Sequence, residues 1–275
     1  MKLTRWHKGT IDYERPKVMG ILNVTPDSFS DGGRYLGKNA LAHVFEMIDA
    51  GVDMIDIGGE STRPYSKGVT AEEEISRITP ILKDVVPSVN VPISVDTMKT
   101  KVAEVALDLG VDIINDIYGL RDEGMLRLVS SADVPVVIMH MHGMPETMQI
   151  DPMQGDVIPQ IIKFLEERTE AALDLGVKKD KIILDPGVGF GKTPEQNVSI
   201  IDNASIFGTE YPVLIGGSRK GFLSKEYPDV DREDASVRVA IRSVKNGADI
   251  VRVHDVRLTV NAFKAKNYRQ DRPKQ

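Results

Sequence analysis

The chain has 275 residues, of which 41% are hydrophobic and none is cysteine, and its formal net charge at pH 7 is -6. This content suffices for one large core or for two domains of ordinary size. The acidic balance argues against a general binder of nucleic acids or anionic membranes, and the absence of cysteine excludes disulfides and thiolate metal sites. The N-terminus lacks the apolar segment of a signal peptide, and no apolar run approaches the ~18 residues of a membrane span, so we predict a soluble cytoplasmic protein.

Eight short apolar runs, rich in isoleucine and valine, recur along the chain and are typical of strands buried on both faces. Four of them begin just after a proline and four just after a glycine. In chain order these residues alternate as Pro16, Gly51, Pro92, Gly110, Pro135, Gly176, Pro212 and Gly247. Proline is tolerated where a strand begins, and a glycine before a strand lies where the preceding helix needs a C-cap.

The segments between the runs predict helices. Leu41, Val44 and Ile48 recur at the spacing of one helical face, and a longer helix is expected over 155–175.

Three residues give expectations about helix ends and continuity. Thr70 with Glu73 predicts a capping box, and Pro80 is expected to interrupt and kink the helix that follows. Thr97 predicts the N-cap of the next helix.

Eight strands alternating with helices predict an α/β fold, a (β/α)8 TIM barrel with a short N-terminal β-hairpin. We expect a single domain over residues 1–275, in which residues 1–15 form a hairpin that plugs the bottom of the barrel and 265–275 form a charged tail. The alternative is a doubly wound open sheet, which rarely needs eight parallel strands without a visible domain break.

Every run ends in polar residues. The eight strand ends carry Asn23, Asp56, Asp96, Asn115 with Asp116, His140, Asp185, Ser218 to Lys220, and Arg252 with His254 and Asp255. In a (β/α)8 barrel these ends converge on the face that bears the active site. A lone Asp or Asn after a strand is usually a helix N-cap, and Asp116 and Asp255 fit that simpler role. Capping does not require arginine, lysine and histidine beside the acids, so the set as a whole predicts a site.

The strand ends offer two kinds of chemistry. Hydrogen-bond acceptors and an amide come from Asp96, Asn115 and Asp185, and they suit a flat heterocycle with adjacent N–H donors. Positive charge and donors come from Arg63, Lys220, Arg252 and His254, and they suit phosphate. We therefore expect a ligand with a donor-rich ring at one end and an anionic group at the other.

The segment "DPGVGFGKT" is similar to a nucleotide phosphate loop but lacks its spacing. Three residues separate Gly187 from Gly191, where a P-loop needs four. The glycines are expected instead to let the backbone pass close to a bound ring.

Two kinds of metal site are compatible with the sequence. His140 and His142 alternate on a strand and face the same way, which leaves a two-histidine metal site open. We favour Mg²⁺, held by Asn23, by loop acids such as Asp27 and by phosphate oxygens of the ligand, because magnesium takes few protein ligands.

From about residue 17 to 260 the sequence resembles the dihydropteroate synthases, the folate-pathway enzymes inhibited by sulfonamides. The resemblance rests on motifs that occur in the family's order: "MGILNVTPDSFSDGG", "DIGGESTRP", "SVDT", "IIND", "MHMHGMPETMQ", "LDPGVGFGK", "GGSRKGF" and "RVHDV". It implies a (β/α)8 barrel, usually a homodimer, that joins 6-hydroxymethyl-7,8-dihydropterin pyrophosphate to p-aminobenzoate and releases pyrophosphate, with Mg²⁺ as cofactor.

The resemblance also implies roles for individual residues. Arg63, Lys220 and Asp96 would be catalytic. The pterin pyrophosphate would be bound by Thr62, Arg63, Asp96, Asn115, Asp185, Lys220, Arg252 and His254. The aminobenzoate pocket would contain Phe29, Thr62, Pro64 and Ser218, and Asn23 would bind the metal. The loops around 27–29 and 61–64 would fold over the site, and the dimer contact is expected near 232–268.

One departure and three alternatives remain. Tyr65-Ser66 stands where bacterial members commonly have "GA", so Tyr65 is a candidate determinant of arylamine preference or sulfonamide affinity. The alternatives are a pterin-binding methyltransferase domain, a synthase that uses a ribosylated arylamine, and a degenerate barrel that only binds pterins. The "STRP", "SRK" and "RVHDV" motifs favour the synthase over the methyltransferase domain, and the choice of arylamine stays open.

Overall fold

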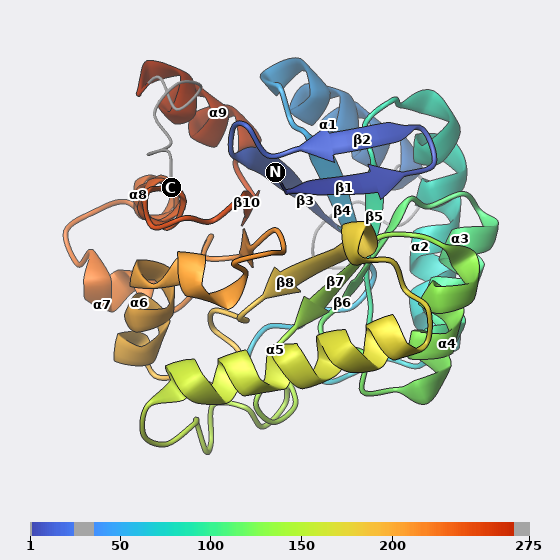
Figure 1. Ribbon diagram of the computed structural model, residues 1–275. Coiled ribbons are helices and arrows are strands. Elements are labelled where there is room, and N and C mark those ends of the chain that lie inside the picture. The colour runs from blue at the N-terminus through green and yellow to red at the C-terminus, as the bar shows by residue number, and fades with distance from the viewer. Residues whose placement is uncertain (1, 25–35, 267–275) are drawn as a thin grey trace.

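The computed structural model describes residues 2–24 and 36–266 of the chain. Within them, eight parallel strands form one sheet in the order β8-β7-β6-β5-β4-β3-β10-β9 (Figure 1). The strands are β3 Lys17–Asn23, β4 Met54–Gly58, β5 Ile93–Asp96, β6 Ile113–Asp116, β7 Val136–Met139, β8 Ile182–Asp185, β9 Leu214–Ile215 and β10 Ile250–Val253. A parallel bridge between Leu184 and Val213 joins the two ends of this order, so the sheet closes into the predicted barrel.

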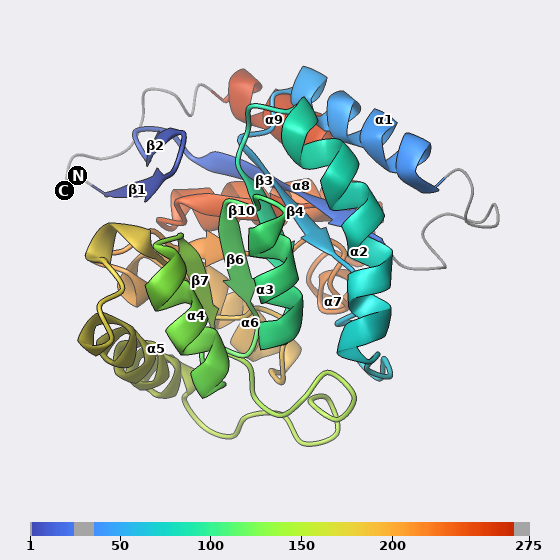
Figure 2. The same ribbon diagram turned by 90° about the vertical axis from the view of Figure 1, so that its right-hand side faces the viewer.

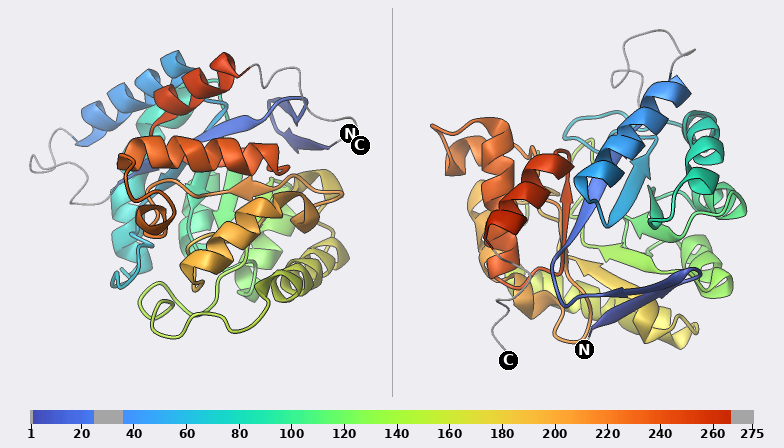
Figure 3. Two further views of the ribbon diagram at one scale, coloured as in Figure 1. Left: turned by 90° about the vertical axis from the view of Figure 1, so that its left-hand side faces the viewer. Right: turned by 90° about the horizontal axis from the view of Figure 1, so that it is seen from above.

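Helices surround the barrel, as the views from two sides show (Figures 2 and 3). They are α1 Leu36–Ala50, α2 Ala71–Val85, α3 Thr100–Asp108, α4 Glu123–Ala132, α5 Val157–Asp174, α6 Pro194–Asp202, α7 Leu223–Glu226, α8 Arg232–Lys245 and α9 Val256–Ala265. Short 3₁₀ turns lie at η2 Val86–Ser88, η3 Lys179–Lys181 and η4 Ala204–Phe207. None of the helices in the described part of the chain has the length and apolar character needed to cross a membrane.

The glycines that precede four of the strands end the preceding helices, as the sequence predicted. Gly51, Gly110, Gly176 and Gly247 follow helices and have φ between 88° and 99°. An L-residue with a side chain is strained in this left-handed region, which is why glycine ends these helices.

The N-terminal hairpin closes the end of the barrel at which the strands begin (Figure 2). Strands β1 Leu3–Trp6 and β2 Gly9–Asp12 pair antiparallel. Ile11 and Tyr13 are buried against inward-facing residues near the beginning of the barrel strands, among them Met19, Met54 and Ile250. The hairpin therefore plugs the bottom of the barrel, as predicted.

Alternation along each strand separates two environments. Ile55, Ile57 and Val95 point outward and belong to the large apolar cluster between the strands and the helices. Asp56, the residue between two of them, points into the barrel and is fully buried. Inward-facing positions of the strands thus form two layers. The apolar residues packed on the hairpin form a floor, and polar residues such as Asp56 form a layer above it.

Two expectations about α2 were only partly right. Thr70 is the N-cap and accepts the backbone N–H of Glu73 at 3.2 Å, as predicted. The Glu73 carboxylate lies 2.5 Å from Arg77 Nη2, one helical turn on. The helix also runs through Pro80 without a break, so the predicted interruption is wrong.

Three further capping expectations have different outcomes. Helix α3 begins at Thr100 with Lys99 as N-cap, and Thr97 instead accepts the Lys99 N–H in the preceding turn, so the cap predicted at Thr97 is wrong. Asp116 does not cap a helix either, because its carboxylate accepts N–H groups of the loop that follows β6. Asp255 does cap α9, accepting the Leu258 N–H at 2.8 Å.

Candidate active site

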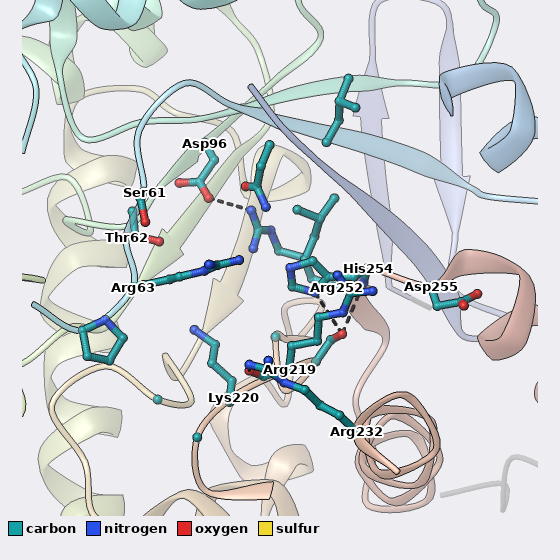
Figure 4. Close-up of a pocket in the computed structure, with 18 of the residues that line it drawn as sticks. Ser61, Thr62, Arg63, Asp96, Arg219, Lys220, Arg232, Arg252, His254 and Asp255 are labelled. Atoms are coloured by element: carbon teal, nitrogen blue, oxygen red, sulfur yellow. Dashed lines mark hydrogen bonds and ion pairs between the residues drawn. The ribbon is translucent and has the colours of Figure 1, made fainter. Parts of the chain in front are cut away.

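A buried ion network spans the barrel above its apolar floor. Arg252 on β10 donates from Nε to Asp56 Oδ2 on β4 and from Nη2 to Asp96 Oδ2 on β5, both at 2.6 Å (Figure 4). Asn115 on β6 donates to the same Asp56 oxygen at 3.0 Å. These inward positions are neighbours because Asp56 pairs in register with Ser94, two residues before Asp96, and Asp96 pairs with Asn115.

Three acceptor atoms of this network have no donor among the described residues. They are Asp56 Oδ1, Asp96 Oδ1 and Asn115 Oδ1, and all three are buried. A buried acceptor without a partner costs free energy, so such atoms call for a ligand or water that supplies donors. The layer thus presents adjacent unpaired acceptors that suit a donor-rich ring. The sequence predicted such a set from Asp96, Asn115 and Asp185. The unpaired atoms belong to Asp56 in place of Asp185.

Burial changes the ionisation of the acids that surround this layer. It raises the pKa of Asp96 to about 7, an effect that Arg252 opposes and Asp56 reinforces. Burial likewise raises the pKa of Asp185 to about 6, against the stabilising N–H of Gly187 and the charges of Lys192, Lys220 and Arg252. Both acids therefore titrate close to neutral pH, as carboxylates of functional sites often do.

Lys220 lies between the acids and an apolar wall. Its Nζ is 4.0 Å from the centroid of the Phe190 ring, within the range of a cation–π contact. Burial lowers the pKa of Lys220 to about 8, helped by Arg252 and opposed by Asp185 and Asp96. Phe190 belongs to a separate apolar cluster that includes Met139 and Met141, so this side of the site offers an apolar face.

Lys192 is buried behind this wall and ties two loops together. Its Nζ lies 2.7 Å from Gly187 O, 3.0 Å from Phe190 O, and 3.0 and 3.3 Å from Nδ1 and O of His140. All four partners are acceptors, so His140 is neutral with its proton on Nε2, and burial lowers its pKa to about 2. A Cβ added at Gly187 would lie 1.8 Å from His140 O. The glycines of "DPGVGFGK" thus let the backbone approach the β7 loop, and no bound ring is needed to explain them.

Ser218 and His254 form a second polar pair at the strand ends. Ser218 Oγ accepts the His254 backbone N–H at 3.3 Å and lies 3.0 Å from His254 Nδ1. Burial lowers the pKa of His254 to about 3, and nearby cations led by Arg219 add to this. A serine hydroxyl that donates to Nδ1 leaves the ring proton on Nε2, so His254 can act as a neutral donor.

A cavity of about 1950 Å³ opens above the ion network. Its lining includes nine of the predicted site residues: Asn23, Thr62, Arg63, Pro64, Asp96, Ser218, Lys220, Arg252 and His254. Arg63 and Lys220 extend from two different loops toward the space in front of Asp96, which is drawn below it in Figure 4. Asn115 and Asp185 are buried in the adjoining strands and do not line the cavity, and Phe29 and Asp27 lie outside the described residues.

Asn23 is the best-placed predicted metal ligand. It ends β3, is half-buried, and lines the cavity beside Gly58 of β4. No group of three or more His, Asp or Glu able to hold a metal occurs within residues 2–24 and 36–266. A single amide oxygen suits Mg²⁺, which completes its shell with phosphate and water. The two-histidine alternative loses support, because His140 Nδ1 faces Lys192.

Sequence reasoning missed two residues of this region and gave a third no specific role. Asp56 was named among the polar strand ends, but its hold on Arg252 and Asn115 was not predicted. Phe190 and Lys192 gave no signal, because a glycine-rich loop does not reveal which of its side chains are buried.

The barrel and the donor-seeking layer at its strand ends are those of a family of pterin enzymes. The model of the family described as "Pterin binding enzyme" matches residues 19–254. The chain therefore belongs to the pterin binding enzyme family.

Its relatives in that family are dihydropteroate synthases. The chain is 43% identical to the dihydropteroate synthase of Neisseria meningitidis serogroup C, with 94% of this chain and 95% of the relative covered. A solved Xanthomonas albilineans dihydropteroate synthase with 4-aminobenzoic acid superposes with a TM-score of 0.88 at 39% identity, covering 96% of each chain. The Burkholderia cenocepacia enzyme complexed with 7,8-dihydropteroate gives 0.87 at 39% identity, covering 97% of this chain and 95% of that one. The resemblance inferred from the motifs is thereby confirmed.

Proposed function

We propose that this chain condenses 6-hydroxymethyl-7,8-dihydropterin pyrophosphate with p-aminobenzoate to give 7,8-dihydropteroate and pyrophosphate. One observation carries the proposal: the unpaired buried acceptors of Asp56, Asp96 and Asn115 belong to one hydrogen-bonded layer, and that layer reaches through Asp96 and Arg252 a cavity that Arg63, Lys220 and His254 also line. A pterin presents adjacent N–H donors at one end, and its pyrophosphate presents anionic oxygens at the other. One relative is solved with 4-aminobenzoic acid and another with 7,8-dihydropteroate, which are the proposed second substrate and product.

The pterin ring would occupy the layer of acceptors. Asp96, Asn115 and Asp185 would accept its N–H groups, with Lys220 donating to a ring acceptor. The Met139 and Phe190 side would cover one face of the ring. Asp56 would act indirectly, because it holds Arg252 and Asn115 in place.

The pyrophosphate would lie at the cationic rim. Arg63, Thr62 and His254 would bind its oxygens, and Arg252 would add positive charge from below. Asn23 would contribute an oxygen to Mg²⁺ at the mouth of the cavity, in keeping with a donor set of one amide. When bound, Mg²⁺ would neutralise negative charge on the pyrophosphate.

The reaction would need no protein nucleophile. The bond between the pterin methylene carbon and the pyrophosphate oxygen breaks, and its electron pair leaves with pyrophosphate. Asp96 would stabilise the cation left on the pterin, while Arg63 and Lys220 would stabilise the departing charge, which makes these three the proposed catalytic residues. The amine of p-aminobenzoate then forms the C–N bond and loses a proton. The acceptor would lie near Thr62, Pro64 and Ser218, with Phe29 contributing from outside the described residues.

We further propose that the chain forms a homodimer through α8 and α9. These helices pack side by side on the outside of the barrel (Figure 3). Analytical ultracentrifugation tests this, since a monomer at micromolar concentration would contradict it.

Pyrophosphate release from the purified protein tests the function. The protein receives dihydropterin pyrophosphate and Mg²⁺, with and without p-aminobenzoate. Release that requires the arylamine, with dihydropteroate formed, is the expected result. Binding of the pterin pyrophosphate without turnover would leave the pterin site standing and reject p-aminobenzoate as acceptor. A ribosylated arylamine would then be assayed, followed by methyl transfer.

A further inference from the structure

A buried ion cluster outside the barrel interior lies at the base of the segment 61–69. Lys99 Nζ is 2.8 Å from Glu60 Oε2 and 2.6 Å from Glu74 Oε2. The side chains of Glu60 and Glu74 are 6% and 0% exposed. Two buried carboxylates thus share one ammonium, an arrangement that apolar packing could replace without loss of stability.

Glu60 closes the segment on itself. Its Oε2 binds Lys99, while its Oε1 accepts the backbone N–H of Val69 at 2.8 Å. Just before it, Gly59 packs so closely against α2 that an added Cβ would lie 2.7 Å from Ile78. Arg77 also donates to Gly59 O at 2.8 Å. Both ends of the segment are therefore held by Glu60 and its immediate neighbour.

The closed segment carries the proposed acceptor contacts Thr62 and Pro64, together with Arg63. Within it, Ser66 Oγ lies 2.6 and 2.7 Å from the backbone oxygens of Ser61 and Arg63, and its single hydroxyl hydrogen is shared between these two acceptors. A segment with such internal bonds moves as a unit. Its position therefore depends on how its base is held and on the bond from the Tyr65 backbone N–H to Pro145 O at 3.1 Å.

Lys99 connects that base to the strand that bears Asp96. It follows Asp96 by three residues, and its backbone N–H donates to Thr97 Oγ1 at 3.2 Å. The Glu74 charge also helps to raise the pKa of Asp96, after burial and Asp56. The cluster thus lies between the segment over the cavity and the acceptor layer beneath it.

We propose that Glu60, Lys99 and Glu74 are positioning residues that fix segment 61–69 over the cavity and thereby set the affinity for the acceptor arylamine. This rests on the proposed function. The pterin pyrophosphate retains the barrel layer as its main binding surface, so the cluster acts chiefly on the second substrate.

The decisive variant is Glu60→Met. It removes the acceptor for Val69 and leaves one ammonium with one carboxylate, which keeps the buried charge balanced. We expect the KM for p-aminobenzoate to rise on the order of tenfold, because small misplacements of positioning groups have effects of this size or larger. The Kd for the pterin pyrophosphate, measured by calorimetry, should rise by a clearly smaller factor, because Thr62 and Arg63 of the segment would contact only its pyrophosphate while the ring keeps the barrel layer. Glu60→Gln keeps an acceptor for Val69 and should recover most of the loss.

The chain offers a matched control nearby. Lys101 Nζ on α3 and Glu72 Oε1 on α2 form an ion pair at 2.7 Å, with both side chains more than half exposed. Glu72→Met should leave both substrate constants unchanged. An unchanged KM for p-aminobenzoate in Glu60→Met, or an equal rise in the pterin pyrophosphate Kd, would overturn the proposal.

Hydrogen exchange separates this proposal from the proposed function. Amides of residues 61–69 should exchange faster in Glu60→Met than in Glu72→Met, whether or not the chain makes dihydropteroate. Absence of synthase activity in the parent would reject the function, whereas equal exchange in the two variants would reject the positioning role. Lys99→Met, compared with Lys101→Met, repeats the test at the other end of the ion pair.

Discussion

Replacing Lys192 with methionine removes a buried ammonium while keeping much of its volume. The ammonium has three N–H donors and four acceptors within 3.3 Å, contributed by Gly187, Phe190 and His140. Because Phe190 lies under Lys220, losing these bonds should disturb the pterin side of the site as well as stability.

The size of the stability effect follows from two opposing contributions. Three hydrogen bonds from a charged donor are worth roughly 5–9 kcal/mol. Burial of the ammonium, which lowers the pKa of Lys192 to about 7, offsets a large part of this gain. The net loss in Lys192→Met is then roughly 2 kcal/mol, or a fall in Tm of about 4–8 °C for a chain of this size.

The assay pairs thermal unfolding with steady-state kinetics. Lys192→Met should raise the KM for the pterin pyrophosphate on the order of tenfold, since Lys220 loses its fixed support. Lys181→Met is the control, because Lys181 is also buried and donates to Asp133 O at 2.8 Å, at the opposite end of β8. It should lower Tm without changing either KM. If Lys192→Met lowers Tm but leaves the KM for the pterin pyrophosphate within about twofold of the parent, the link from Lys192 to Lys220 is refuted.

Three further predictions concern pH, Tyr65 and metal. Affinity for the pterin pyrophosphate should fall as the pH drops below about 7. Burial raises the pKa of Asp96 to about 7 and that of Asp185 to about 6, and a protonated carboxyl loses acceptor capacity. Calorimetry that shows constant affinity between about pH 8 and 5 would contradict this. Tyr65 has a φ of 65°, so Tyr65→Gly should leave stability nearly unchanged, because the relieved backbone strain offsets the added entropy of the unfolded chain. The same variant should alter arylamine preference and sulfonamide inhibition. If neither the arylamine preference nor the sulfonamide inhibition changes, the role of Tyr65 is rejected. Chelation should abolish product formation, and Asn23→Ala should raise the Mg²⁺ concentration needed to restore it; a parental Mg²⁺ requirement would remove Asn23 from the metal site.

The fold was predictable because its signals are local and repeated. Each strand is an apolar run bounded by a proline or a left-handed glycine, and eight repetitions determine the barrel. The helix starts were less predictable, because several polar residues precede each helix and only packing selects one. Thr97 and Lys99 illustrate this: threonine is the better cap by type, yet the backbone enters α3 two residues later.

The candidate site was predictable where strand ends supply its residues, and less so elsewhere. Asp96, Lys220 and Arg252 follow from barrel geometry alone. The partners of Lys192 could not be predicted, because it contacts backbone oxygens from two loops whose mutual approach is decided by packing. Glu60 was similarly hidden, since a glutamate beside a glycine pair in the sequence is indistinguishable from a solvated one.

The buried carboxylates explain why arginine and lysine side chains lie near the centre of this barrel. Asp56, Asp96 and Asp185 place three carboxylates in a space that burial makes unfavourable for charge, and Arg252 and Lys220 offset only part of it. Filling the same positions with apolar residues would be more favourable for folding alone. A ligand with many N–H donors and a cationic reaction centre compensates for this unfavourable burial when it binds. It supplies the missing donors in the ground state and positive charge in the transition state. The arrangement that weakens the empty barrel is therefore the one that selects the proposed substrate.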